Sequence, residues 1–119
     1  MANHNELGKL GEEIARKFLE EKGYRIKAVN WKWGKAELDI IAEDGNILVF
    51  VEVKTRQSIA FGYPEEAVGN KKEKMIYAAA VEYMDSISYE KEIRFDIISV
   101  TMEPKLKVEH FPDAFFPIW

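Results

Sequence analysis

Two short segments of the chain combine carboxylates with a lysine at spacings that suit metal-assisted chemistry. The first segment contains Glu37 and Asp39, and the second contains Glu52 and Lys54. Carboxylate oxygens are the ligands that hard divalent cations such as Mg²⁺ take in proteins. A lysine near those acids can stabilise negative charge on a phosphate group. The four residues therefore predict a site in which a metal ion and a lysine act on phosphate.

A hairpin is the element that positions these residues. Residues 36–42 and 47–54 are rich in β-branched and apolar residues, which predicts two strands, and the Asp44-Gly45 pair between them is a hairpin turn signal. Side chains on a strand alternate between two faces, and directly paired residues share a face. A turn centred on Asp44-Gly45 therefore predicts that all four charged residues project from one face of the sheet.

The expected register places Asp39 opposite Phe50 and Glu37 opposite Glu52. Asp39 and Glu52 are then diagonal neighbours, about 7–8 Å apart at the backbone, which lets both carboxylates lean onto one cation. A solvated strand face explains the same charges without a metal. The spacing alone gives the two interpretations equal weight.

A third acid comes from the helix predicted over residues 6–22. Glu12 lies beside Ala15 and Leu19, at the boundary of the apolar stripe, whereas Glu13 falls on the polar side. Glu12 is therefore the better candidate to face a cleft. An ion pair with Arg16 at the protein surface is the alternative, and the helix pattern alone favours it. The stripe itself is expected from residues at helical spacing, namely Leu7, Leu10, Ile14 and Phe18.

Composition restricts the kind of metal site. The chain of 119 residues has no cysteine and two histidines, His4 and His110. Disulfides, thiolate zinc sites, iron–sulfur clusters and cysteine nucleophiles are therefore excluded. A metal must be held by oxygen ligands, which favours Mg²⁺ or Mn²⁺ as the cofactor.

The charge is unevenly distributed along the chain. The net charge is −4, from 21 acidic and 17 basic residues, which taken alone argues against nonspecific nucleic-acid binding. Residues 22–36, however, contain five basic residues and no acid, with Trp31 and Trp33 among them. Basic side chains can contact backbone phosphate, and an exposed tryptophan can stack on a base. The alternative is that the tryptophans belong to the core. The expected nucleic-acid contacts are Lys32, Lys35, Arg56, Lys71 and Lys72.

The chain is predicted to form a single domain over residues 1–119, with α/β (α+β) architecture, a mixed sheet and the element order αβββαββ. The tail 111–119 is aromatic and is expected to be pinned to the core or to a partner. A polar N-terminus and the lack of a long apolar run indicate a cytoplasmic protein that does not enter membranes. The expected helices cover residues 6–22 and 71–87, and the expected strands 24–33, 36–42, 47–54, 93–101 and 106–111.

Four sequence blocks resemble the bacterial YraN-like proteins, and the resemblance extends from Gly8 to about Phe115. That family is similar to the archaeal Holliday-junction resolvases of the PD-(D/E)XK, restriction-endonuclease-like, nuclease superfamily. The blocks that carry the resemblance are Gly8-x-x-Gly11-Glu12, Glu37-Leu-Asp39-Ile-Ile, Val51-Glu52-Val53-Lys54-Thr55-Arg56 and Arg94-Phe95-Asp96.

The resemblance implies an endonuclease with a restriction-endonuclease-like αβββαβ core, in which helices flank a central mixed sheet. It implies that Asp39, Glu52 and Glu12 hold Mg²⁺ or Mn²⁺ and that Lys54 completes the catalytic set. Glu37 is then an accessory ligand, and Arg56 is expected to contact phosphate. The expected partners are DNA, with branched DNA as the specific form, and a second copy of the chain in a homodimer.

The strand-four residues Arg94 and Asp96 are expected to brace the fold rather than to catalyse. Two other functions stay open at this point. One is a nucleic-acid-binding module on a nuclease fold with little or no catalysis, and the other is a protein-interaction adaptor that uses the aromatic tail.

Overall fold

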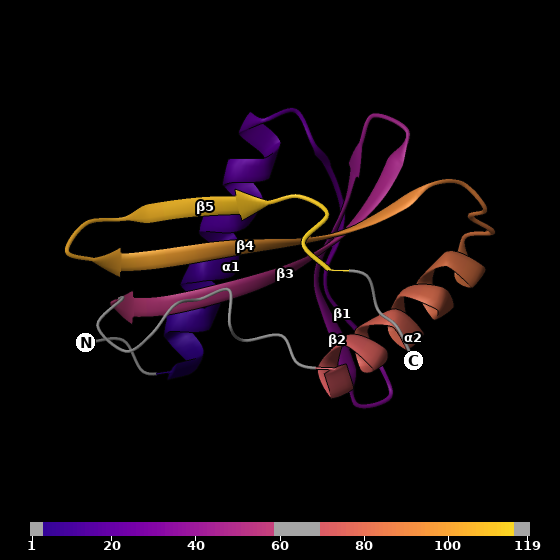
Figure 1. Cartoon of the computed structure of the whole chain (residues 1–119), viewed down its shortest axis with the longest axis horizontal. Helices are drawn as coiled ribbons and strands as arrows, with labels where there is room; N and C mark the ends of the chain where they lie inside the picture. Colours follow the sequence, from indigo (N-terminus) through magenta and orange to yellow (C-terminus); the bar gives the residue numbers. More distant parts are fainter. Residues whose placement is uncertain (1–3, 59–69, 116–119) are drawn as a thin grey trace.

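The computed structural model describes residues 4–58 and 70–115 of the chain. Two helices and five strands follow one another in the predicted order, and Figure 1 shows their arrangement. Their bounds are α1 His4–Glu21, β1 Arg25–Trp33, β2 Ala36–Asp44, β3 Ile47–Ser58, α2 Asn70–Ser86, β4 Ile93–Glu103 and β5 Lys107–Phe111.

The five strands form one mixed sheet in the order β1-β2-β3-β4-β5. All neighbours are antiparallel except β3 and β4, which are parallel. Parallel neighbours need a crossover connection, and the segment between β3 and β4 that contains α2 supplies it. The predicted mixed α/β (α+β) fold is therefore confirmed, and it is compatible with a restriction-endonuclease-like core.

The two helices cover opposite faces of the sheet. Ile40 and Val49 pack in one apolar cluster with α1, whereas their chain neighbours Ile41 and Leu48 pack in a second cluster with α2. Side chains next to one another along a strand point to opposite faces, so the central strands are buried on both sides. In Figure 1, α1 runs across the strands of the sheet, and α2 lies beside β1 and β2.

The β2–β3 hairpin differs from the predicted register by two residues. Asp44 pairs directly with Ile47, so that the turn consists of Gly45 and Asn46 alone, and Ile41 lies opposite Phe50. Gly45 has a φ of 60°, a left-handed conformation that glycine adopts without strain. A shift of two residues leaves the alternation of faces unchanged, so the predicted opposition of Asp39 to Phe50 is wrong while the grouping of the charged residues survives.

Helix α1 packs against β3 through its small residues. Gly11 and Ala15 are buried, while Leu10, placed in the predicted stripe, is 49% exposed. A Cβ atom on Gly11 would overlap the side chain of Thr55 in β3. The buried face of α1 is therefore centred on the residues that permit close approach, and it lies nearer to Glu12 than the predicted stripe does.

Gly11→Ala is expected to destabilise the protein by about 1–3 kcal/mol, because the new methyl group must displace either Thr55 or the helix. Urea unfolding of the two proteins measures the difference. Gly8→Ala is the matched control, since nothing lies within 4 Å of a Cβ built there. Equal stability of the two alanine variants would contradict close packing at Gly11.

The remaining predicted segments fall partly outside the described residues. Strand β3 continues to Ser58, beyond the predicted end at Lys54. Helix α2 ends at Ser86, one residue before the predicted end, and Ile87, which follows it, is 47% exposed. Of the aromatic tail, Phe115 packs on Phe95 with ring centroids 5.3 Å apart, which confirms that this part is pinned to the core. Residues 116–119 lie outside the described part of the chain.

Neither helix in the described parts of the chain is long and apolar enough to cross a membrane.

Candidate active site

The candidate site opens where β2 and β3 stop pairing. The last pair in their ladder is Ile40 with Val51. Beyond it, the backbone N–H of Val53 donates a hydrogen bond of 2.8 Å to the Asp39 carboxylate. A side chain thus takes the place of the next strand residue as hydrogen-bond acceptor, and this bond fixes the Asp39 carboxylate beside β3.

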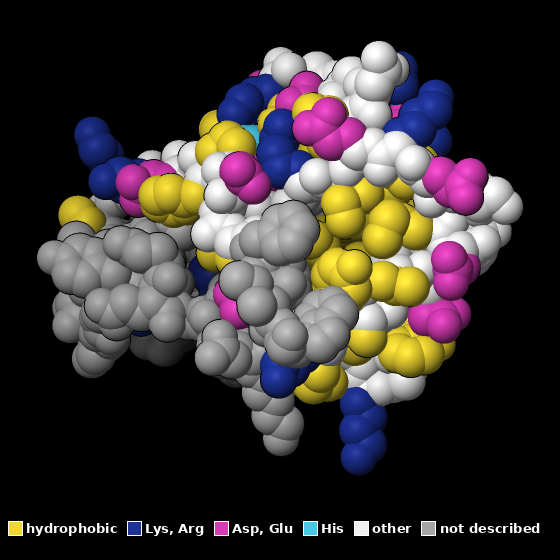
Figure 2. Space-filling model, turned by 45° about the vertical axis from the view of Figure 1, so that its right-hand side comes forward, with side chains coloured by type: hydrophobic (Ala, Val, Ile, Leu, Met, Phe, Trp, Pro, Cys, Tyr) yellow, Lys and Arg dark blue, Asp and Glu magenta, His cyan; other side chains and the backbone are white. Residues whose placement is uncertain are grey.

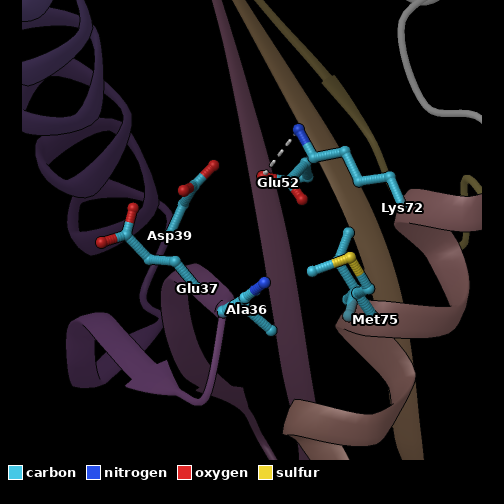
Figure 3. Close-up of a pocket in the computed structure, with 8 residues that line it drawn as sticks. Ala36, Glu37, Asp39, Glu52, Lys72 and Met75 are labelled. Atoms are coloured by element: carbon cyan, nitrogen blue, oxygen red, sulfur yellow. Dashed lines mark ion pairs between the residues drawn. The ribbon is translucent and has the colours of Figure 1, made fainter.

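A hollow of about 230 Å³ lies at this point, between the strands and the first turns of α2. Three of the predicted acidic residues, Glu37, Asp39 and Glu52, line it. Figure 3 shows their side chains together with that of Lys72, which reaches in from α2. The hairpin and α2 therefore bring together residues that are widely separated in the sequence.

Asp39 and Glu52 form a pair of neighbouring carboxyl groups. Glu52 is 5% exposed and Asp39 is partly buried, and the two groups interact with each other. Burial, the hydrogen bond with Glu52 and the charge of Glu52 together raise the pKa of Asp39 to about 8. Two such carboxylates need a shared proton or a cation between them. With oxygen ligands only, this donor set fits Mg²⁺ or Mn²⁺.

Two lysines stand beside the acid pair. The ammonium of Lys72 lies 3.8 Å from a Glu52 carboxylate oxygen. Burial and the neighbouring Lys72 lower the pKa of Lys54 to about 8. Burial alone would also lower the pKa of Lys72, but Glu52 and the other neighbouring groups outweigh it and raise the pKa. Lys54 is therefore the lysine that gives up a proton more easily.

Glu12 lines a second, open hollow of about 630 Å³ on the α1 side, and Glu37 lines both hollows. Burial and the charge of Asp39 raise the pKa of Glu12, although a hydrogen bond with Asn30 opposes the rise. Arg16 instead pairs with other acids of its own helix, among them Glu20 at 2.7 Å. The predicted cleft position of Glu12 is thus supported over the surface pair with Arg16.

Asn30 is a residue that the sequence analysis missed. It lies within β1, yet its φ is 50°, in the left-handed region, which asparagine tolerates better than most residues. Its neighbours Val29 and Trp31 pair with Ile40 and Leu38 of β2, so Asn30 interrupts the ladder at the level of Asp39. The interruption leaves its amide available to Glu12. In the sequence, the only sign of this role is an asparagine within the predicted strand 24–33.

The predicted basic patch divides into two parts. Lys32 lines the α1 hollow and lies 3.8 Å from Glu37, and Lys35 lines the hollow of the acid pair. At the other end of β1, Arg25 pairs with Glu43 at 2.9 Å instead. The acid-free stretch of sequence therefore supplies basic residues to the site only from its second half.

The other predicted contacts are placed as follows. Arg56 belongs to β3 and is not among the residues that line these two hollows, and the side chain of Lys71 is outside the described parts. Trp31 packs edge-on against Tyr83, with ring centroids 5.4 Å apart, so it is a core residue, while Trp33 is 45% exposed.

The structure brings two of the three predicted metal ligands together. Among residues 4–58 and 70–115, no group of three or more acidic or histidine side chains is close enough to hold a metal ion. Asp39 and Glu52 adjoin, whereas Glu12 is near enough to influence Asp39 but bonds to Asn30. The three-carboxylate metal site therefore stays a prediction.

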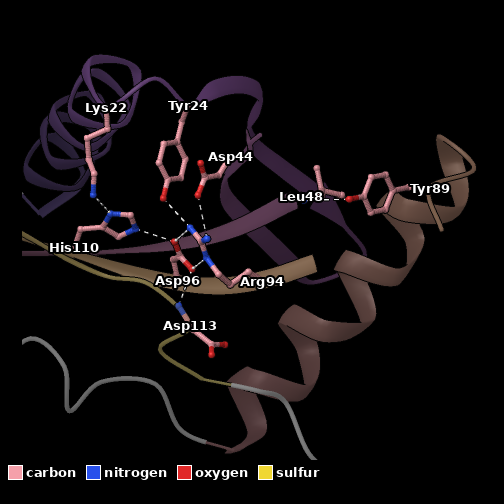
Figure 4. Close-up of polar contacts among 9 residues, drawn as sticks. All are labelled: Lys22, Tyr24, Asp44, Leu48, Tyr89, Arg94, Asp96, His110 and Asp113. Atoms are coloured by element: carbon pink, nitrogen blue, oxygen red, sulfur yellow. Dashed lines mark hydrogen bonds and ion pairs between the residues drawn. The ribbon is translucent and has the colours of Figure 1, made fainter. Parts of the chain in front are cut away.

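Arg94 and Asp96 stand apart from these two hollows in a polar network of their own. Asp96 is fully buried and accepts hydrogen bonds from Arg94 at 2.8 and 2.9 Å, and its carboxylate lies 2.7 Å from His110. Figure 4 shows how these contacts link β4 to its neighbours. The network braces strand β4, as the sequence analysis expected.

Comparison with known proteins identifies the family of this chain. The model of the Uncharacterised protein family UPF0102 matches residues 11–100. A UPF0102 protein of Flavobacterium psychrophilum is 53% identical over 117 residues, covering 98% of both chains. One from Dictyoglomus turgidum is 44% identical, covering 95% of this chain and 99% of its own. The chain belongs to the UPF0102 family, and the predicted kinship with the YraN-like proteins is confirmed.

Among solved structures, this chain is similar to Pyrococcus furiosus SfsA, determined in complex with Ca²⁺. The TM-score is 0.41 at 19% identity, and the match covers 94% of this chain and 64% of that one.

Proposed function

We propose that this protein is a metal-dependent endonuclease that hydrolyses phosphodiester bonds in DNA, with branched DNA as its preferred form. The observation that carries the proposal is the buried pair of Asp39 and Glu52 beside Lys54. Burial of like charges is costly unless a cation or proton separates them. A protein keeps such a pair where chemistry needs it.

Asp39 and Glu52 would hold the Mg²⁺ or Mn²⁺ ion, with Glu12 as a third ligand and Glu37 as an accessory. When bound, the ion supplies a Lewis acid that activates water and offsets charge on the phosphate. Lys54 carries its ammonium next to the acids, where it can stabilise the charge that develops on phosphorus or orient the attacking water. Lys72 balances the charge of Glu52 and can contact the same phosphate.

The hollow on the α1 side is the natural path for the DNA strand next to the cleaved bond. Lys9 and Lys32 line it, and both can contact phosphate, while the amides of Asn5 and Asn30 can donate to and accept from base edges. Since Glu37 lines both hollows, a strand lying here leads directly to the acid pair. A role in DNA cleavage also accords with the predicted cytoplasmic location.

The experiment is a cleavage assay on four-way, flapped, single-stranded and duplex DNA, with Mg²⁺, Mn²⁺ or EDTA. We expect cleavage of branched DNA that needs the divalent ion and that falls at least a hundredfold in Lys54→Met. Lys17→Met is the matched control, because Lys17 is an exposed lysine of α1 outside both hollows. Full activity in Lys54→Met would refute the proposed site.

A binding module without catalysis is the second candidate. It is favoured by the contact of Lys72 with Glu52 and by the absence of a three-acid cluster in the described ranges. Its signature in the same assay is salt-dependent binding of branched DNA with no cleavage in either metal. That result would replace the endonuclease proposal.

Asn30→Gly is expected to lower cleavage about 10–100-fold and to raise the Mg²⁺ concentration needed for half-maximal rate. Glycine adopts the left-handed φ of residue 30 without strain, so the change removes the hydrogen bond to Glu12 and little else. A Mg²⁺ titration of the cleavage rate measures the effect, and unfolding curves check that the fold is kept. An unchanged titration would show that Asn30 does not position Glu12.

A further inference from the structure

The side of α2 that faces away from the sheet carries an apolar patch. A hollow of about 360 Å³ lies there, between α2 and the end of β1, and Figure 2 shows hydrophobic side chains gathered on this side of the molecule with charged ones around them. The residues that line it are Trp33, Lys74, Tyr77, Ala78, Val81 and Glu82.

This exposed apolar patch is separate from the face of α2 that packs against the sheet. Ile76, Ala80 and Tyr83 already pack into the core beneath α2. A helix that covers a sheet needs only one apolar stripe, with polar residues on the side exposed to solvent. Here the exposed side keeps apolar residues, and Trp33 beside them remains 45% exposed. Grouped exposed apolar side chains of this kind mark interaction surfaces.

The charges on this face are symmetric about one residue. Lys74 and Glu82 lie four residues before and after Ala78 on the same stripe of α2, which places each about 6 Å along the helix from it. A two-fold axis through Ala78 would set a second α2 antiparallel to the first. Lys74 of each copy would then meet Glu82 of the other, giving two equivalent ion pairs.

We propose that this face is where a second copy of the chain docks, through an antiparallel α2–α2 contact centred on Ala78. A two-fold contact requires a surface that is complementary to itself, and opposite charges placed evenly about a small apolar residue meet that requirement. The small side chain of Ala78 lets the helices approach closely, and Trp33 beside α2 widens the apolar contact. The contact does not depend on the proposed nuclease activity.

The test is sedimentation velocity of the full-length protein over a range of concentrations. We expect the wild type to dimerise. Lys74→Glu and Glu82→Lys should each weaken the dimer about tenfold or more, because each change turns two attractive pairs into repulsive ones. The double variant Lys74→Glu/Glu82→Lys should regain the wild-type dissociation constant, since it exchanges the charges and restores both pairs.

Lys17→Glu and Glu21→Lys are the matched controls, because they make the same charge changes on α1. They should leave the dimer unchanged. A wild type that stays monomeric at about 100 µM would overturn the proposal. So would a double variant as weak as the single ones, or an Ala78→Arg variant that folds and still dimerises like the wild type.

Discussion

Asp39→Asn is expected to reduce DNA cleavage by roughly 10²–10³-fold while making the metal-free protein more stable. The loss of activity follows from the removal of one of the two carboxylates that adjoin in the site. The gain in stability follows from the same pair, because without a cation the folded protein must take up a proton to relieve the repulsion between Asp39 and Glu52, and the unfolded chain does not need that proton at neutral pH. Opposite effects of one substitution are typical of residues kept for function at the expense of stability.

The gain in stability should be about 1–2 kcal/mol in EDTA. Asparagine keeps an oxygen that accepts the hydrogen bond from the Val53 N–H, so the end of the strand ladder is retained. Its amide can also donate to Glu52. In the presence of Mg²⁺ the order should reverse, since the ion stabilises the wild type by binding only to the folded state.

Guanidinium unfolding of both proteins, in EDTA and in Mg²⁺, measures these differences, and Asp85→Asn at an exposed position of α2 is the matched control. If Asp39→Asn lost stability in EDTA, the carboxylate would be a structural group held by favourable contacts. That outcome would argue against a cation site even if cleavage were also lost.

The grouping of Asp39 with Glu52 was predictable because it depends only on which residues share a face. The hairpin turn is two residues longer in the prediction than in the structure, yet the error is an even number and leaves the faces unchanged. The error does change which residues oppose one another. For Glu12 the helix position correctly indicated the acid nearer to a cleft, but the helix pattern alone favoured a surface pair with Arg16, which pairs with Glu20 instead.

The contact of Lys72 with Glu52 and the role of Asn30 could not be predicted from the sequence, for different physical reasons. Lys72 meets Glu52 only because α2 returns to the sheet after residues 59–69, and no local pattern fixes where that helix begins relative to β3. Asn30 acts through a left-handed backbone conformation inside a strand. Strand propensities do not predict such a conformation, since it is set by the pairing of β1 with β2.

Asp96→Asn is expected to destabilise the protein by about 3–5 kcal/mol, the cost of leaving a buried charged group without its partner. Asp96 is fully buried and receives hydrogen bonds from Arg94 and from the backbone N–H of Asp113 at 2.9 Å. Arg94 in turn donates to Asp44 at 3.1 Å and to Tyr24 at 2.7 Å. The loss of one carboxylate therefore loosens contacts from β4 to β2 and to the start of β1.

The histidine on β5 depends on the same carboxylate. Lys22 lies 2.7 Å from Nδ1 of His110, and because an ammonium only donates hydrogen bonds, that nitrogen must accept. The proton of the neutral ring is then on Nε2, which donates to Asp96 at 2.7 Å. An asparagine amide group turned toward this ring cannot accept that bond and those of Arg94 equally well, so His110 and Lys22 should also lose order.

Lowering the pH should remove the difference in stability between the wild type and Asp96→Asn. Burial alone would raise the pKa of Asp96, but the hydrogen bonds from His110, Arg94 and Asp113 together hold it below its ordinary value. A carboxyl group whose pKa is lowered by folding stabilises the protein above its ordinary pKa of about 4, and this contribution is lost as the pH falls through the folded value. The stability difference between wild type and Asp96→Asn should therefore be constant near neutral pH and shrink below about pH 4.

Urea unfolding at a series of pH values measures this difference, with Asp85→Asn as the exposed control. A difference that stayed constant into acid would mean that Asp96 stabilises the fold by packing and not by charge.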